Sequence, residues 1–550
     1  MPVRLHRSQS SQSNGSHKGF GGFIHGITHS RTGSPDPKAP MISSAKLIDE
    51  ENNPKYNAQN FYPMRLGERL NDRYEVVAKL GYGMTATVWL ARDTQASPSP
   101  GSRKYVSIKV NVNTMTTDFL NGRRDIARTL LQGNKSHPGY LHVRFMIETF
   151  SLKTKHGEHL CIVYDVLREP LDECMQKLPN RLFSSSQLRK LLPALLKGLD
   201  YMHTDCHIVH TDLKADNIMI GLGDDPNGVL DKFVTHLTLV PPARKPQEKE
   251  DHRIIYQSSS DLHLVGNKQD SYNLTDAEIA TAKITDMGLA EFADRGNLTH
   301  PIQSNVFTCP EVLLGIPWSY PADIWNLGVM LWDFFETQGL FDCIECKPGR
   351  YHGDDHLAAM IALLGPPPKE LLDRAMKASR YFDYDREKEE WIFKQAKLVQ
   401  KYDMSWDNMV THMRGPNKES FVDLAKKMIC WDPRERWTAA QLLAHPWLRE
   451  KPGTMTCMPL DFTVAHRTLS QSDARDAEAR ASIAGSLAAS PAASDIFKLP
   501  GTSYFDFKNG TLTPPEQGIV HRSTSQSFIS MQSIKEDLPS QSPPRSTPAN

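Results

Sequence analysis

The chain has 550 residues, and its 64 Lys and Arg are balanced by 64 Asp and Glu, so the formal net charge is zero. That balance argues against bulk electrostatic binding to nucleic acid or to a membrane surface. A hydrophobic fraction of 39% and a mean hydropathy of −0.47 predict a globular core with polar tails.

No membrane or export signal is evident. There is no run of 18 apolar residues, and the start MPVRLHRSQS lacks the apolar core of a secretory signal. Eight scattered cysteines are typical of free thiols in a reducing compartment, so we expect a cytoplasmic or nuclear protein. Cys343 and Cys346, followed by His352 and His356, match no common zinc-finger spacing, and we predict no metal there.

The chain begins with a polar segment and then turns to strands. Residues 1–60 are rich in Ser, Gly, His and Pro, which predicts a disordered tail. From residue 73, short apolar or alternating runs predict strands in YEVVAKLGYG, TATVWLARD, KYVSIKVNV and HLCIVYDVL. SQLRKLLPALLKGLDYMHTD then places leucines at helical spacing. Strands first and helices later predict two unlike lobes.

The second half is mainly helical and ends in another tail. Residues 221–279 are polar and irregular, which predicts a partly disordered surface insert. Helical patterns return in ADIWNLGVMLWDFFE and continue to AAQLLAHPWL. Residues 451–550 are rich in Ser, Ala, Pro and Thr and predict a second disordered tail.

A glycine-rich turn and a lysine form the first candidate site. In LGYGMTATVWLA, Gly81 and Gly83 fit G-x-G-x-x-G, whereas Ala86 takes the third glycine's place. Such a hairpin lets backbone N–H groups approach phosphate oxygens. Lys109 lies in the apolar run VSIKV, where a lysine needs a partner, and it could reach the α- and β-phosphates.

The loop HIVHTDLKADNIMI carries the second group of residues. Asp212 can accept a hydroxyl proton, Lys214 can neutralise a transferred phosphate, and Asn217 can ligate a metal ion. Asp286 in KITDMGLAEF can hold magnesium that bridges phosphates. Each residue alone could be an ordinary polar loop group, but the set in this order predicts phosphoryl transfer.

With these motifs the chain resembles the eukaryotic protein kinases over residues 73–448, and more closely the SR-protein kinase family in a divergent fungal form. HTDLKADN, TVWLA, HLCIVYDVL, PEVLLGIPWSYPADIWNLGVMLWDFFE and IALLGPPPK carry the resemblance. It implies an α+β bilobal fold flanked by the disordered tails. The implied parts are a small, mainly β N-lobe (73–167), a large, mainly α C-lobe (168–448) and the insert (221–279).

The resemblance also implies ATP and Mg²⁺ and a role for each motif residue. The implied catalytic residues are Asp212, Lys214 and Lys109, and the implied metal ligands are Asn217 and Asp286. Adenine would be held by the backbones of Asp165 and Leu167, beside the gatekeeper Tyr164. The implied nucleotide-binding set is Leu80, Gly81, Gly83, Val88, Lys109, Asp165 and Leu167. Structural roles are implied for Asp323, which would anchor the catalytic loop, and for the pair Glu311 and Arg436.

Several positions depart from the family pattern. Thr211 replaces an Arg that in many kinases holds a loop phosphate, which implies activity without that phosphate. The helix that should pair a Glu with Lys109 has none in TTDFLNGRRDIARTLLQG. Asp125 is the best replacement, although another alignment places Arg123 there. Smaller departures are Ala86 in the glycine motif, Ser107 above the adenine and Thr308 before C-P-E.

Two functions remain open from the sequence. The first is a monomeric serine/threonine kinase that acts on proteins, with Arg/Ser-rich substrates implied by the resemblance and no direct nucleic-acid or membrane partner. An acidic docking surface could then form from Asp342, Glu345, Asp354 and Asp355, although these also fit an ordinary solvated loop. The alternative is a pseudokinase scaffold without turnover.

The tails place Ser or Thr near Arg in RSQS, RTGS, HRTLS and PPRST. They are therefore candidate autophosphorylation sites or simple linkers.

Overall fold

The computed structural model describes residues 39–99, 101–115, 117–178, 181–248, 253–259, 274–344, 351–449, 504–506 and 511–513. Residues 1–38 and nearly all of the predicted C-terminal tail lie outside this set. Its short C-terminal pieces pair as β13 (Tyr504–Asp506) and β14 (Thr511–Thr513). Within the described residues, no helix has the length and apolar character needed to cross a bilayer.

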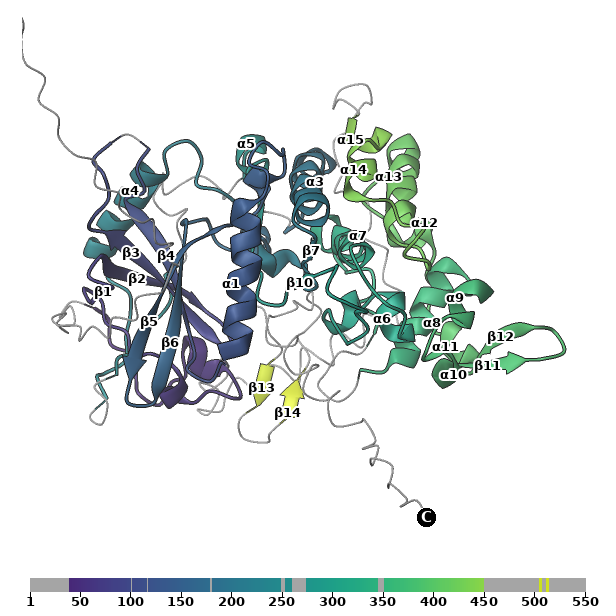
Figure 1. Ribbon diagram of the computed structural model, residues 1–550, viewed down its shortest axis with the longest axis horizontal. Coiled ribbons are helices and arrows are strands. Elements are labelled where there is room, and N and C mark those ends of the chain that lie inside the picture. Colours follow the sequence, from purple (N-terminus) through teal and green to yellow (C-terminus); the bar gives the residue numbers. More distant parts are fainter. Residues whose placement is uncertain are drawn as a thin grey trace, which may run out of the picture.

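The smaller lobe is built on an antiparallel sheet with α1 (Thr117–Gln132) beside it, facing the larger lobe (Figure 1). In the strand β4, alternate residues take opposite faces: Val106 and Ile108 pack with Trp89, whereas Ser107 and Lys109 lie on the other side. The strands run in the order β1 (Arg69–Leu70), β2 (Tyr74–Tyr82), β3 (Ala86–Asp93), β4 (Tyr105–Asn111), β6 (Gly157–Tyr164) and β5 (Met146–Thr154).

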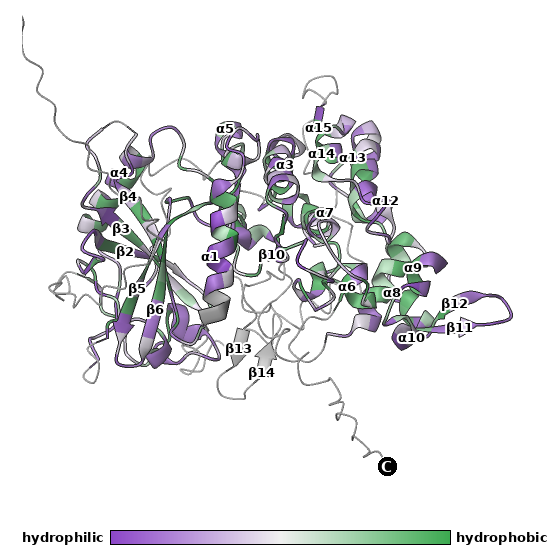
Figure 2. Ribbon diagram, viewed as in Figure 1, coloured by the Kyte–Doolittle hydropathy of each residue, from purple (hydrophilic) through white to green (hydrophobic). Residues whose placement is uncertain are grey.

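The larger lobe is helical and is centred on α7 (Pro321–Phe335), nearly all of whose side chains are buried. Figure 2 shows this helix as predominantly hydrophobic. The other helices of this lobe are α2 (Leu171–Lys177), α3 (Ser185–Asp200), α5 (Asp276–Ile279), α6 (Pro310–Leu314), α8 (Gly353–Leu364), α9 (Lys369–Asp373), α10 (Ala378–Tyr381), α11 (Ala396–Val399), α12 (Trp406–Met409), α13 (Gly415–Met428), α14 (Ala439–Leu443) and α15 (Pro446–Arg449).

Short strand pairs position the loops at the junction of the lobes. One pair joins β7 (Ile208–Val209) to β10 (Glu291–Phe292), and another joins β8 (Ile218–Met219) to β9 (Lys283–Ile284). Both pairs bracket the segment that contains Asp212 and the segment that contains Asp286. A third pair, β11 (Phe382–Asp385) with β12 (Glu390–Phe393), forms a hairpin that projects from the larger lobe (Figure 1).

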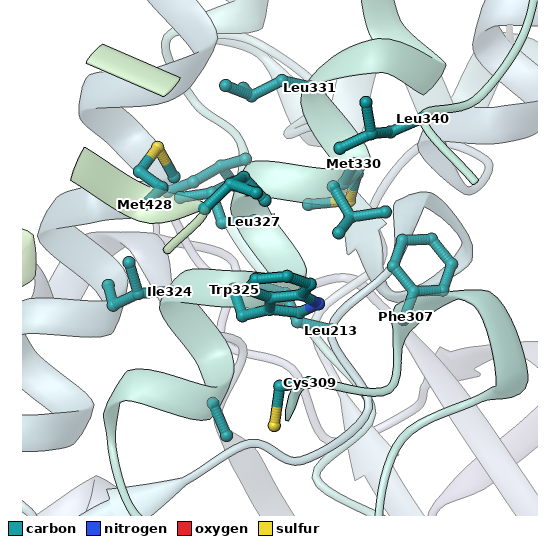
Figure 3. Packing of buried hydrophobic residues seen from close by; sticks show 14 of the residues in the cluster. Leu213, Phe307, Cys309, Ile324, Trp325, Leu327, Met330, Leu331, Leu340 and Met428 are labelled. Carbon is teal, nitrogen blue, oxygen red and sulfur yellow. The ribbon is translucent and has the colours of Figure 1, made fainter. Parts of the chain in front are cut away.

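The core of the larger lobe reaches the loop that contains Asp212, the predicted catalytic loop. Leu213, which follows Asp212, is 1% exposed and belongs to the same buried cluster as Trp325 and Met330 of α7. Figure 3 shows Leu213 among these side chains. Burial of this leucine fixes the backbone between Asp212 and Lys214, so the apolar core restricts where the polar side chains can lie.

The insert differs from the prediction. It forms α4 (Pro226–Leu239), whose Leu230 and Phe233 pack on the smaller lobe in a buried cluster with Ala78 and Leu90. Further along, Tyr256 lies against Trp89, with ring centroids 5.9 Å apart. The helix α4 and the segment around Tyr256 are therefore folded against the sheet, because they supply apolar side chains within a polar average composition.

Residues 39–60 also differ from the predicted disordered tail. Glu50 is 6% exposed and forms an ion pair with the buried Lys79 of β2, and Asp49 lies 3.0 Å from the same ammonium. Lys79 also donates to the carbonyl of Tyr256 at 3.0 Å. The N-terminal segment, the glycine-rich strand and the insert thus meet at one buried lysine, whose charge requires these partners. The α+β bilobal fold itself is confirmed.

Candidate active site

Lys109 and Asp286 form an ion pair between the lobes. Lys109 Nζ lies 2.9 Å from Asp286 Oδ1, and the side chains are 26% and 45% exposed. Desolvation opposes both charges, yet the pairing raises the pKa of Lys109 above its ordinary value and lowers the pKa of Asp286 to about 2. Both groups are therefore charged at neutral pH and face the place where phosphates would lie.

Among the side chains of α1 that the structure describes, residues 121–132, none is an acidic partner of Lys109, and the prediction for Asp125 is wrong. The Asp125 side chain is 46% exposed and binds Arg128, with 3.0 Å between Oδ1 and Nη1. Residues two apart on a helix point in different directions, and Arg123 shares the inward face with Ile126 and Leu130. Arg123 rather than Asp125 therefore faces the junction of the lobes.

Arg123 forms hydrogen bonds with the backbone next to Asp286, the predicted metal ligand. Its Nη1 donates to the carbonyls of Met287 and Ala290 at 3.1 and 2.8 Å. Desolvation lowers the pKa of Arg123, and the carboxylates of Glu291 and Asp286 partly offset this shift. The positively charged Arg123 on α1 thus binds two backbone carbonyls within residues 286–290, called the D-M-G segment below, and does not repel Lys109 directly.

In the predicted catalytic loop, the side chain of Asp212 contacts those of Lys214 and Asn217. Asp212 Oδ2 lies 3.1 Å from Lys214 Nζ and 3.2 Å from Asn217 Nδ2. Asn217 Nδ2 also donates to the backbone carbonyl of Asp212 at 2.8 Å. The amide nitrogen of Asn217 is thereby assigned to Asp212, which leaves its carbonyl oxygen as the atom that could ligate a cation.

The fully buried Asp323 at the start of α7 anchors this loop. Its carboxylate accepts from the backbone N–H groups of His210 and Thr211 at 2.7 and 2.9 Å, and it lies 2.9 Å from His203 Nε2. Thr211 has φ of 68°, a left-handed conformation that a β-branched residue rarely adopts. The bonds to Asp323 hold that conformation, so the role predicted for Asp323 is supported by the geometry.

The Thr211 hydroxyl connects the catalytic loop to the D-M-G segment. It donates to the carbonyl of Leu289 at 2.7 Å, while His210 Nε2 lies 2.8 Å from the carbonyl of Thr285. Asp286, between these two carbonyls, has φ of 53°. Thr211 therefore fixes the segment by a neutral hydrogen bond at the position where an Arg could have gripped a phosphate.

The predicted nucleotide-binding residues line the strands above this loop. A Cβ added at Gly81 or Gly83 would meet no atom within 4 Å, so the backbone of the turn is open to an approaching group. Leu80 and Val88 are half-buried, and Val88 lies opposite Lys109 in the ladder. Tyr164, Asp165 and Leu167 follow at the end of β6.

Sequence reasoning missed Arg144, which no motif marks. Its Nη2 donates to the carbonyl of Asp165 at 2.6 Å, and its guanidinium lies over the ring of Tyr164, 4.7 Å from the centroid. Nη1 donates to Met219 Sδ at 3.5 Å. The available signal was a lone charge in the run VRFMI that leads into β5, and that signal is weak.

The predicted brace of the larger lobe is present. Arg436 and Glu311 are both buried, and two parallel bonds of 2.6 Å join the guanidinium to the carboxylate. Burial works against the charge, but Glu311 raises the pKa of Arg436. This bidentate pair ties α6 to the segment before α14.

The donor set suits magnesium. Asp286 supplies a carboxylate and Asn217 an amide carbonyl, and oxygen atoms are the ligands that Mg²⁺ prefers. Lys109 pairs with Asp286, Asp212 contacts Asn217, and the charge of Lys214 helps to lower the pKa of Asp286, so these groups lie around the same site. Cys346 and Glu345 lie outside the described residues, so neither the Cys-x-x-Cys pair nor the whole predicted acidic surface can be assembled.

Two members of that acidic surface have local partners. Asp342 accepts from the backbone N–H of Gly339 at 2.6 Å, and Asp355 accepts from the hydroxyl of Tyr402 at 3.2 Å. Asp354 and Asp355 also lie in the first turn of α8, where acidic side chains favour the helix. Docking by these residues stays a prediction.

Known proteins resemble this chain over most of its length. The sequence model of the protein kinase domain matches residues 74–227 and 271–448. A serine/threonine protein kinase of Aspergillus fumigatus is 31% identical over 410 residues, which cover 74% of this chain and 93% of the relative. The serine/threonine-protein kinase SRPK of Physarum polycephalum is 27% identical, with 74% and 94% covered. Protein kinase dsk1 of Schizosaccharomyces pombe is 25% identical, with 74% and 87% covered.

Proposed function

This chain belongs to the protein kinase domain family, and on that premise we propose that it transfers the γ-phosphate of ATP to serine hydroxyls of Arg/Ser-rich proteins. Its relatives are serine/threonine kinases, and the chain is a serine/threonine protein kinase, as the sequence predicted. The observation that carries the proposal is the assembled set of charges: Lys109 on Asp286, and Asp212 on Lys214.

Each residue has a part in the proposed transfer. The serine oxygen attacks the γ-phosphorus, the bond from that phosphorus to the leaving oxygen of ADP breaks, and the hydroxyl proton passes to Asp212. Lys214 and Lys109 offset the negative charge on the phosphate oxygens. Asn217 and Asp286 would hold Mg²⁺, which neutralises charge on the phosphates when it is bound.

The comparisons do not support the scaffold alternative, and the structure offers one observation in its favour, the inward-facing Arg123 on α1. A chain that only binds nucleotide can lose its base or metal ligand, whereas Asp212, Asn217 and Asp286 are all present. The lack of an acidic partner for Lys109 among the described side chains of α1 is the main argument for a scaffold. The grip of Arg123 on the D-M-G backbone offers another way to hold that segment.

The Arg/Ser preference rests on resemblance to the SR-protein kinases. It is tested with purified full-length protein, ATP and Mg²⁺ on three matched peptides, with Arg-Ser, Lys-Ser and Glu-Ser repeats. Asp212→Ala serves as the blank, and Asp383→Ala, which changes a carboxylate that is 76% exposed, serves as the matched control. We expect transfer to the Arg-Ser peptide to be fastest and to vanish only in Asp212→Ala. Equal rates on all three peptides would contradict the proposed preference for Arg/Ser-rich substrates, whereas the kinase activity itself would stand.

A further inference from the structure

We infer that Arg144 reads the nucleobase and lets the site accept a 6-oxopurine such as GTP, as well as ATP. This inference rests on the proposed function, because it concerns the nucleotide of that same site. It begins from the carbonyl of Asp165, the acceptor expected to face the 6-amino group of adenine. In the structure that acceptor already binds Nη2 of Arg144 at 2.6 Å.

The Arg144 side chain is held from several directions. Its backbone N–H donates to the carbonyl of Ile284 at 2.9 Å, next to the segment that leads to Asp286. Val143 pairs with Ile284 and is buried in the larger lobe, so the adjacent Arg144 side chain takes the opposite side. The guanidinium then crosses the Tyr164 ring and contacts Met219 Sδ. Contacts to three separate elements fix it against the end of β6, at Tyr164 and Asp165.

Arg144 shares its surroundings with the predicted phosphate-binding pair. The charge of Arg144 lowers the pKa of Lys109, and the charge of Asp286 raises that of Arg144, although desolvation is the larger influence on both cations. Such mutual effects require proximity. Together with the contacts of the guanidinium to Tyr164, Asp165 and Met219, these effects place it beside the predicted nucleotide site.

Two polar atoms at this place lack partners among the described residues. Arg144 Nε is buried and makes no hydrogen bond, and neither does Oγ of Ser107, whose residue is 1% exposed. Ser107 pairs with Tyr164 in the ladder and shares its face of β4 with Lys109. Buried polar groups without partners are costly, and a bound base with its own polar edge could satisfy them.

The chemistry of the guanidinium sets the preference. A bare carbonyl at Asp165 accepts from the 6-amino group of adenine but opposes the 6-oxo group of guanine, which is also an acceptor. Arg144 covers that carbonyl with N–H groups and so presents donors, and guanidinium donors match O6 and N7 of guanine. Adenine bound through Asp165 would have to share the carbonyl with Arg144, and its 6-amino donor would then lie against the donors of the guanidinium. The arginine therefore favours the 6-oxopurine and disfavours adenine relative to an apolar residue.

The test compares ATP and GTP in the wild type, in Arg144→Met and in Arg128→Met, a control that removes an exposed arginine of α1. Methionine keeps the length of the side chain but removes the donors. Two readouts are taken with full-length protein and Mg²⁺: kcat/KM for transfer to the Arg-Ser peptide, and calorimetric binding of each nucleotide. We expect Arg144→Met to raise the ATP-over-GTP ratio by about tenfold or more, mainly through KM, as loss of one bidentate base contact predicts.

Each outcome decides the inference. An ATP-over-GTP ratio that changes by less than about twofold in Arg144→Met overturns the inference. An equal gain in affinity for both nucleotides also overturns it, because Arg144 would then only obstruct the site. An equal loss for both overturns it as well, because Arg144 would then be structural. A shifted binding ratio without phosphate transfer supports the inference and defeats the proposed function instead. If neither nucleotide binds the wild type, both fail.

Discussion

Lys109 Nζ lies 2.9 Å from the carboxylate of Asp286, the residue predicted to hold magnesium. The helix α1, from which a glutamate would be expected to reach this lysine, supplies Arg123 instead, and Arg123 binds the carbonyls of Met287 and Ala290. The active site is thus held together by the D-M-G segment itself: its carboxylate pairs with the lysine, and its backbone is gripped by the helix.

Arg123→Met should lower kcat about tenfold without changing the KM for the peptide. Hydrogen bonds from a charged donor contribute about 1.5–3 kcal/mol each, and loss of about 1.4 kcal/mol of transition-state stabilisation is a factor of ten. The loosened D-M-G segment should also raise the Mg²⁺ concentration needed for half-maximal rate. Arg128→Met is the control. A normal rate in Arg123→Met beside a slow Asp125→Asn would restore the discarded pairing.

Phosphatase treatment should leave the initial rate unchanged. Thr211 donates to the Leu289 carbonyl and carries no charge that could hold a loop phosphate. Thr211→Val, which keeps the shape but removes the hydroxyl, should reduce the rate several-fold because the backbone carbonyl loses its partner. Mass spectrometry before and after treatment establishes the phosphate content. A rate that falls in proportion to the phosphate removed would show that a group other than Thr211 binds an activating phosphate.

The segment after D-M-G should become easier to cleave as the pH rises through the neutral range. His300 Nε2 lies 2.9 Å from Glu291, and this hydrogen bond raises the pKa of His300 above its ordinary value near 6.5. The pairing is therefore complete below the ordinary pKa and is lost as pH rises through the raised one. Limited proteolysis between pH 6 and 9 measures this. His300→Gln should show no such pH dependence, and a dependence that persists there would assign it elsewhere.

Glu311→Gln should destabilise the protein by about 3–5 kcal/mol, because it leaves the fully buried Arg436 charge uncompensated. Urea unfolding monitored by tryptophan fluorescence gives the free energy of unfolding. Asp373→Asn, which breaks an exposed pair with Lys369, is the matched control and should leave the midpoint unchanged. Similar midpoints for the two variants would show that the brace contributes little.

Phe233→Ala should cost about 3–5 kcal/mol of stability if α4 packs on the smaller lobe as described. Phe233 is 1% exposed, whereas Val240, just beyond the helix, is 57% exposed, so Val240→Ala is the control. Differential scanning calorimetry should show the loss in the transition of the smaller lobe. Indistinguishable curves for the two variants would return the insert to a loosely attached surface segment.

Much of the fold was predictable because its patterns are local. The two-residue alternation in VSIKV predicts a strand, and the leucines of α3, at a spacing of three to four residues, predict a helix. The structure contains both elements. The order of motifs placed Asp212, Lys214 and Asn217 on one loop, where they lie in contact. Asp323 was placed by its motif on a helix below that loop, and it binds there.

The failures have physical causes. Asp125 was chosen by charge alone, whereas the inward face of α1 is set by Ile126 and Leu130, which turn Asp125 outward. The insert was judged by average polarity, which concealed Leu230 and Phe233 at helical spacing. Glu50 belongs to a polar N-terminal segment with no local pattern. Its burial depends on the ion pair with Lys79, which is 29 residues away in the sequence. Such long-range partners cannot be inferred from a local pattern.

The most direct test of the account is the initial rate of phosphate transfer from ATP by the full-length protein, with and without Mg²⁺, in the wild type and in Asp212→Asn. The account predicts a magnesium-dependent rate that falls by at least about a hundredfold in Asp212→Asn, since a positioned base contributes that much or more. Equal rates in the two proteins, or no transfer by either despite magnesium-dependent ATP binding, would contradict it.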